Sequence, residues 1–161
     1  MNKNLKKNKG FGLVEIILGA SILTVGILAL IISYTTYVKF ALSNQKNVQA
    51  AYLLEEGIEA VTILRDKGWT ANIATLSTTT TYYLSWNGSH FATTTTAQYV
   101  DGQFLRSVGI SDVKRDGSDR IATAGTWDPN TKKITATVSY FQGHATTTKS
   151  IASYISNIYS N

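Results

Sequence analysis

The chain has 161 residues, no cysteine and a formal charge of +5, which excludes disulfide and thiol chemistry and allows one modest domain beside an anchor. Four of its 15 basic residues lie within the first ten positions, and the other 11 face 10 acidic residues. Because the remainder is nearly neutral and carries no basic stripe interleaved with aromatic residues, the composition gives no support to nucleic-acid binding. The N-terminal lysines instead indicate an end that stays on the cytoplasmic side of a membrane.

Residues 11–33 form the first predicted element, an apolar helix of membrane-spanning length. The run FGLVEIILGASILTVGILALIIS contains one charge and no proline. At about 1.5 Å per residue it covers the roughly 30 Å hydrocarbon core of a bilayer. It is longer than the apolar region of a typical secretory signal, and no small-residue cleavage site follows it. We therefore expect a single-pass anchor in the cytoplasmic (inner) membrane, with the N-terminus inside and the C-terminal domain outside.

The one charge in this run, Glu15, needs an explanation, because a carboxylate deep in a bilayer costs about 2.5–3.5 kcal/mol on insertion scales. Either Glu15 lies close enough to the interface to stay hydrated, or it is matched to a cation. A cut after Gly10 would place a cationic α-amine on Phe11, four residues before Glu15. That amine would come from the same helix or from a neighbouring subunit.

Residues 9–15, KGFGLVE, resemble the cleavage and methylation motif of type IV prepilins and of the pseudopilins of type II secretion. In that family a membrane aspartic peptidase removes a short basic leader that ends in glycine and methylates the new N-terminal residue. The resemblance implies that leader 1–10 is removed between Gly10 and Phe11, that Phe11 is N-methylated, and that Glu15 is kept as the assembly carboxylate. Glu15 would then set the register between subunits.

The resemblance also implies the partners and a role. The partners are other pilin or pseudopilin subunits, the prepilin peptidase, the inner-membrane assembly platform, and membrane lipid before assembly. From the residues themselves we expect no cofactor and no metal. The segments ILTVGIL (22–28) and AAYLLEEGIEA (50–60) are similar to minor pilins and minor pseudopilins, which start or cap a filament. Many major pilins carry an anchor proline where this chain has Ile32.

The helical pattern continues through residues 34–67, which contain no proline and a single glycine, Gly57. One apolar stripe is predicted to pack on a C-terminal domain; it consists of Ala51, Leu54, Ile58 and Val61. A separate acidic face consists of Glu55, Glu56 and Glu59. Gly68 is the predicted stop.

Residues 68–161 predict an antiparallel sheet of four to six strands, because alternation of apolar and polar residues replaces helical spacing. The predicted reversals are a two-residue hairpin turn at Asn87-Gly88 and a turn at Asp128-Pro129-Asn130. The segment from Ile134 to Tyr140 alternates cleanly, a last strand is expected near 147–156, and Trp69 is expected in the core. The fold class is therefore α+β and pilin-like: a long N-terminal helix packed on a small C-terminal antiparallel sheet.

Two groups of side chains raise the question of other chemistry. Three carboxylates lie close together in the sequence, namely Asp112, Asp116 and Asp119. Their spacing does not match a known calcium loop, and neighbouring basic residues offset their charge, so we expect a solvated turn. His90 and His144 lie in no ligand-spaced or catalytic motif, so we expect no enzymatic activity.

Three functions stay open. The first is a structural subunit of a type IV pilus or pseudopilus, expected to be a minor subunit, which moves from the membrane to a surface pilus or a periplasmic pseudopilus. The second is a major pilin or a subunit of a DNA-uptake filament. The third is a membrane-tethered binding domain that never polymerises.

Overall fold

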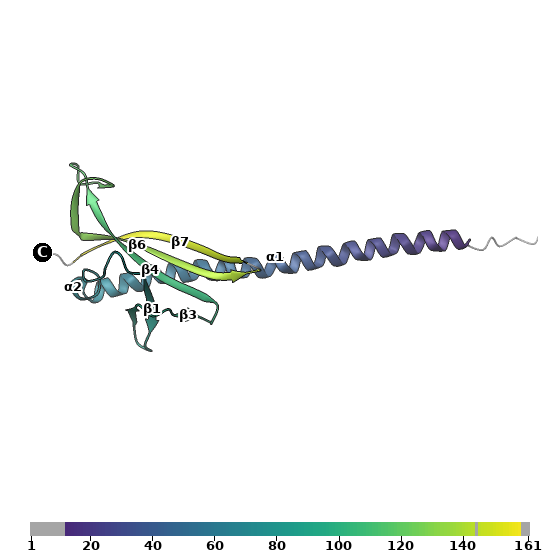
Figure 1. The fold of residues 1–161 in the computed structure, drawn as a ribbon, viewed down its shortest axis with the longest axis horizontal. Helices are drawn as coiled ribbons and strands as arrows, with labels where there is room; N and C mark the ends of the chain where they lie inside the picture. Colours follow the sequence, from purple (N-terminus) through teal and green to yellow (C-terminus); the bar gives the residue numbers. More distant parts are fainter. Residues whose placement is uncertain (1–11, 144, 159–161) are drawn as a thin grey trace, which may run out of the picture. The chain divides into compact units, whose positions relative to one another are not determined.

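The computed structural model describes residues 12–143 and 145–158, which form two helices and seven strands (Figure 1). The helices are α1 (Leu13–Lys67) and α2 (Trp69–Asn72). The strands are β1 (Tyr82–Trp86), β2 (Phe91–Thr94), β3 (Tyr99–Val100), β4 (Phe104–Arg115), β5 (Ile121–Ala122), β6 (Thr126–Gln142) and β7 (Ala145–Ser156). The chain divides within α1 into two units, one ending at Asn44 and the other running from Gln45 to Asn161.

The predicted α+β arrangement, a long N-terminal helix packed on a small antiparallel sheet, is confirmed. The strand order is β2-β1-β4-β6-β7, with β3 and β5 also pairing with β4, and every pairing among the described strands is antiparallel. The expected number of strands, four to six, was too low. The difference comes from β3 and β5, which have two residues each and are too short to show a period of two in the sequence.

Helix α1 ends where the sequence predicts. Lys67 is its last residue, and Gly68 has a φ of 150°, a backbone conformation that glycine adopts far more readily than other residues. The Gly68 N–H donates to the carbonyl of Arg65 at 3.0 Å, which closes the last turn. The chain then enters α2, where Trp69 is only 7% exposed, so its predicted place in the core is confirmed.

The core of the second unit lies between α1 and one face of the sheet. The helix contributes Ala50, Leu54, Gly57, Ala60, Val61 and Leu64. The predicted alternation in β6 is confirmed, since its buried face consists of Ile134, Ala136, Val138 and Tyr140. One helix prediction was wrong, because Ala51 is exposed and Ala50 is fully buried. The buried positions recur every three or four residues from Ala50, as expected for one face of a helix. This face begins one residue before the predicted stripe.

Two hydrogen bonds join α1 to the C-terminal end of β6, close to where the second unit begins. The Tyr140 hydroxyl donates to Asn47 Oδ1 at 2.6 Å, and Lys46 Nζ donates to the Phe141 carbonyl at 3.0 Å. Burial raises the pKa of the Tyr140 hydroxyl. Tyr140 therefore supplies both apolar surface and a hydrogen bond at the end of the core, as buried tyrosines commonly do.

The hairpin between β1 and β2 is confirmed, but its loop is longer than predicted. Trp86 pairs with Phe91, so the loop contains four residues, 87–90, rather than two. The Asn87 side chain explains the extension, since its Oδ1 accepts the N–H groups of Ser89 at 3.1 Å and His90 at 2.9 Å. An asparagine that bonds the backbone two and three residues later organises a wider turn than an Asn-Gly pair alone.

The predicted turn at Asp128-Pro129-Asn130 was wrong, because these residues lie inside β6. The pairing of β4 with β6 jumps here from Asp112↔Lys132 to Val113↔Asp128. Residues 129–131 therefore form a bulge rather than a chain reversal. Proline has no N–H to donate to a ladder, and a bulge is one of the few places in a strand that accept it.

Gly57 allows the close approach of α1 to the sheet, and its substitution gives a test of this packing. A Cβ atom at position 57 would lie 3.2 Å from Ala136 Cβ and 3.5 Å from Arg106 Cδ. Gly57→Leu is therefore expected to force α1 away from β6 and lower the stability of the second unit by about 1–3 kcal/mol. The measurement is thermal unfolding of the full-length chain in detergent micelles, followed by circular dichroism.

The matched control is Gly26→Leu, because a Cβ at this other glycine of α1 meets nothing within 4 Å among the described residues. This variant is expected to unfold no earlier than the wild type, since leucine has the higher helix propensity. Equal stability of both leucine variants would contradict the assignment of Gly57 to the helix–sheet contact.

Candidate functional site

Residues 13–37 of α1, here named the assembly segment, are all exposed. They include thirteen large aliphatic side chains, each more than half exposed: Leu13, Val14, Ile16, Ile17, Leu18, Ile22, Leu23, Val25, Ile27, Leu28, Leu30, Ile31 and Ile32. The helix is long and apolar enough to cross a membrane. An uncovered apolar surface of this extent is typical of a segment whose surroundings are lipid or other protein chains.

Glu15 lies in the first turn of the assembly segment, and Gly10 and Phe11 lie outside the described residues. Glu15 Oε2 accepts the N–H of Gly12 at 2.8 Å, while the Gly12 carbonyl accepts the N–H groups of Glu15 at 3.0 Å and Ile16 at 3.3 Å. Gly12 is thus the N-cap residue that precedes Leu13, and Glu15 reaches back to it as the acidic member of a capping box does. The carboxylate also lies at the positive end of the helix dipole. Glu15 therefore has a role within its own helix, which the sequence analysis did not anticipate.

Three glycines, Gly12, Gly19 and Gly26, are spaced seven residues apart and share one side of the assembly segment. A Cβ built at Gly19 or Gly26 would meet nothing within 4 Å among the described residues, so this side is open. Small residues along one side of a helix allow another helix backbone to approach closely. This spacing was not among the predicted features, although it can be read from the sequence.

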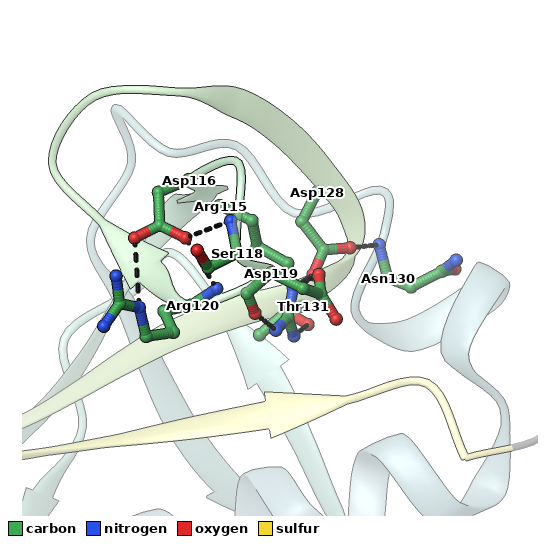
Figure 2. A network of polar contacts seen from close by, with 8 residues as sticks. All are labelled: Arg115, Asp116, Ser118, Asp119, Arg120, Asp128, Asn130 and Thr131. Carbon is green, nitrogen blue, oxygen red and sulfur yellow. Dashed lines mark hydrogen bonds and ion pairs between the residues drawn. The ribbon is translucent and has the colours of Figure 1, made fainter.

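The three neighbouring aspartates of the sequence lie at or near an arm formed by the end of β4, by β5 and by the start of β6. They are Asp112, Asp116 and Asp119. We name residues 113–128 the polar arm, which leaves the rest of the sheet in Figure 1. Figure 2 shows Arg115 at its centre, with Nε 2.6 Å from Asp128 Oδ2. Arg115 Nη1 donates to the Asp119 carbonyl at 2.8 Å, and Nη2 donates to Thr131 Oγ1 at 3.2 Å. One guanidinium thereby joins both sides of the arm.

The aspartates are engaged in different contacts rather than gathered around one point. Asp112 pairs with Lys132, outside the arm. Asp116 accepts the N–H groups of Ser118 at 2.8 Å and Arg120 at 3.0 Å, which closes the turn seen in Figure 2. Among the described residues, no group of three His, Cys, Asp or Glu side chains could hold a metal ion.

These contacts lower the pKa values of three carboxyl groups. The pKa of Asp112 is lowered chiefly by its hydrogen bond with Lys132, and that of Asp116 by the backbone N–H groups of Arg120 and Ser118. The pKa of Asp128 is lowered first by the Thr131 hydroxyl and then by Arg115. Asp116 and Asp128 therefore favour the folded arm in their ionised forms, and ionised Asp112 favours its contact with Lys132 beside the arm.

The polar arm is expected to open as the pH falls below about 4, the pKa of an aspartate in an unfolded chain. Because the folded pKa values are lower, ionisation stabilises the arm above that pH, and the stabilisation is lost as the pH falls through the folded values. The measurement is amide hydrogen exchange of residues 113–128 between pH 6 and pH 3, corrected for the intrinsic rate. Residues 134–140 of β6 serve as an internal control, and equal acid sensitivity in both stretches would contradict the prediction.

His90, the histidine within the described residues, lies at a hairpin tip and belongs to neither the apolar segment of α1 nor the polar arm. His90 Nε2 lies 3.0 Å from Asn87 Nδ2 at the tip of the β1–β2 hairpin, and His144 lies outside the described residues. Comparison of the chain with protein-family models, with curated proteins and with solved structures found no match.

Proposed function

We propose that the chain is a structural subunit of a helical filament of the type IV pilin class, either a pilus or a pseudopilus, and that it has a minor, initiating or tip-associated role. The observation that carries the proposal is that one helix, α1, supplies both an exposed apolar assembly segment and the residues that pack on an antiparallel sheet. The KGFGLVE motif at residues 9–15 supports the same class. The chain has no enzymatic activity of its own in this proposal and is a substrate of the prepilin peptidase.

Assembly transfers the assembly segment from lipid to the helices of neighbouring subunits. Since lipid tails are as apolar as leucine, the hydrophobic effect does not distinguish these two surroundings. Close packing and polar contacts must therefore favour the filament. The open side at Gly19 and Gly26 allows close packing.

Glu15 supplies the polar contact. Removal of residues 1–10 exposes a cationic amine on Phe11, and the amine of one subunit pairs with Glu15 of the next. A carboxylate that is unfavourable in lipid becomes favourable when it is paired, so it opposes the lone subunit and favours one register of the filament. The hydrogen bond from Gly12 N–H occupies Oε2 and leaves Oε1 for the amine.

The test is quantitative mass spectrometry of sheared surface filaments and of the membrane fraction, following the N-terminal peptide. A peptide that starts at methylated Phe11, present at trace level relative to another pilin, is the expected result. The same peptide as the dominant species would make the chain a major subunit. An intact leader ending in Lys9-Gly10, found only in the membrane, would overturn the proposal in favour of a tethered binding domain.

A further inference from the structure

An aromatic groove lies in the second unit, where α1 meets the β1–β2 hairpin and β3. Two adjoining cavities of about 500 and 470 Å³ share Glu56, Trp86 and Phe91 as lining residues. Tyr99 also lines the first cavity, and Glu59 and His90 also line the second. Each cavity has the size of a small-molecule site.

Two aromatic side chains of the groove, Trp86 and Tyr99, are exposed, whereas Phe91 is half-buried against the core, and all three lie at strand ends. Trp86 is the last residue of β1 and is 59% exposed, and Tyr99 is the first residue of β3 and is 62% exposed. The Trp86 and Phe91 rings contact each other edge to face, with centroids 5.0 Å apart. Exposed rings held in place in this way offer flat apolar surfaces to a ligand at little entropic cost.

Arg106 of β4 forms the floor of the groove and fixes one of its polar groups. Its side chain is 4% exposed, its Nη1 lies 2.8 Å from Glu56 Oε2, and its guanidinium carbon lies 5.6 Å from the centre of the Phe91 ring. Its buried Nε and Nη1 have no hydrogen-bond acceptor among the described residues, so the contact of Nη1 with Glu56 is an ion pair without hydrogen-bond geometry. Burying a donor without an acceptor opposes folding, so this placement of Arg106 is unfavourable for folding alone. Arg106 instead holds the Glu56 carboxylate in the groove and lies over the Phe91 ring.

The charges of the groove nearly cancel, and this selects the class of ligand. Arg106 offsets Glu56, and Lys67 lines the same cavity as Glu59. A cationic ligand would meet no net negative charge. An anionic ligand would meet the carboxylates of Glu56 and Glu59, and the charge of Arg106 is already offset by Glu56. The groove offers flat apolar faces together with fixed hydrogen-bonding groups, an arrangement suited to a ligand that is apolar on one face and hydroxylated at its edge.

We propose that the aromatic groove binds a neutral saccharide. A sugar ring stacks its C–H face on Trp86 or Tyr99, and its hydroxyl groups donate to the carboxylates of Glu56 and Glu59. This inference concerns the second unit alone and does not depend on filament assembly.

The test uses the full-length chain in micelles of octaethylene glycol dodecyl ether, a detergent with neither a sugar nor a cationic headgroup. Binding to immobilised neutral, sialylated and sulfated oligosaccharides is measured, with choline chloride as a competitor. We expect binding to neutral oligosaccharides, at least tenfold weaker in Trp86→Ala and unaffected by choline. The matched control is Trp127→Ala, because Trp127 is 54% exposed but lies in the polar arm, outside the groove.

Tyr99→Ala serves as a second groove variant, and thermal unfolding verifies that all three variants are folded. A lack of binding to any neutral oligosaccharide would overturn the proposal, as would equal losses in Trp86→Ala and Trp127→Ala. Binding to acidic glycans alone would show an anion site instead. Displacement of the neutral glycans by choline would show a cation site.

Discussion

Glu15→Leu is expected to reduce entry of the subunit into filaments by more than tenfold while membrane insertion stays intact. In the proposed filament, assembly would bury the α-amine of a neighbouring subunit, and loss of its carboxylate partner from a buried pair costs about 2–5 kcal/mol. A cost of 1.4 kcal/mol already corresponds to tenfold. The measurement is the ratio of variant chain in sheared filaments to variant chain in the membrane fraction, by quantitative immunoblotting.

Glu15→Gln separates the pairing role from the capping role. Glutamine keeps an oxygen that accepts the Gly12 N–H, as it does in a capping box, but carries no charge. We therefore expect the glutamine variant to assemble as poorly as the leucine variant. Normal assembly of Glu15→Gln would assign the function of this residue to the helix cap, and normal assembly of both variants would remove Glu15 from the assembly mechanism.

Glu56→Ala is expected to destabilise the second unit by about 2 kcal/mol or more, because it leaves the charge of Arg106 buried without a partner. Fully buried pairs cost about 3–5 kcal/mol when one partner is removed. The expected value is lower because the Glu56 side chain is 44% exposed. Urea unfolding of the full-length chain, followed by circular dichroism, gives the free energy.

Two further variants test whether the unpaired charge of Arg106 causes the loss of stability. Glu59→Ala removes an exposed glutamate from the same helix and is expected to stay within about 0.5 kcal/mol of the wild type. Arg106→Met removes the charge but keeps most of the volume, so its combination with Glu56→Ala is expected to recover most of the lost stability. If Glu56→Ala were no worse than Glu59→Ala, the ion pair would contribute nothing to the fold.

The elements that could be predicted from the sequence are those with local periodicity. The end of α1 at Gly68 and the buried face of β6 from Ile134 to Tyr140 follow from spacing and from one glycine. Each of these signals lies within about ten consecutive residues. The α+β class follows because the helical pattern and the alternating pattern occupy separate parts of the chain.

The errors arose where residues distant in the sequence decide the structure. The bulge at residues 129–131 depends on a ladder with β4 that continues on both sides of Pro129. Gly57 is buried because Ala136 lies opposite, 79 positions later, and nothing near Gly57 in the sequence indicates this.

The candidate sites also differ in whether neighbouring or distant residues form them. Glu15 stands out in the sequence as the single charge of an apolar run, so it could be found without a structure. Its hydrogen bond with Gly12 spans only three residues and could also have been predicted from capping preferences. The aromatic groove could not, because Glu56, Trp86, Tyr99 and Arg106 come from four different elements.

The spacing of Gly12, Gly19 and Gly26 determines how neighbouring helices would cross. Seven residues fall about 20° short of two full helical turns, so a contact line through these glycines winds slowly around the helix. Two helices that follow such a line cross with a left-handed twist at a shallow angle of about 20°. Glycines four residues apart instead favour a right-handed crossing near −40°. The assembly segment is therefore suited to nearly parallel helices in long contact, so that each interface is extended along the axis rather than confined to one crossing point.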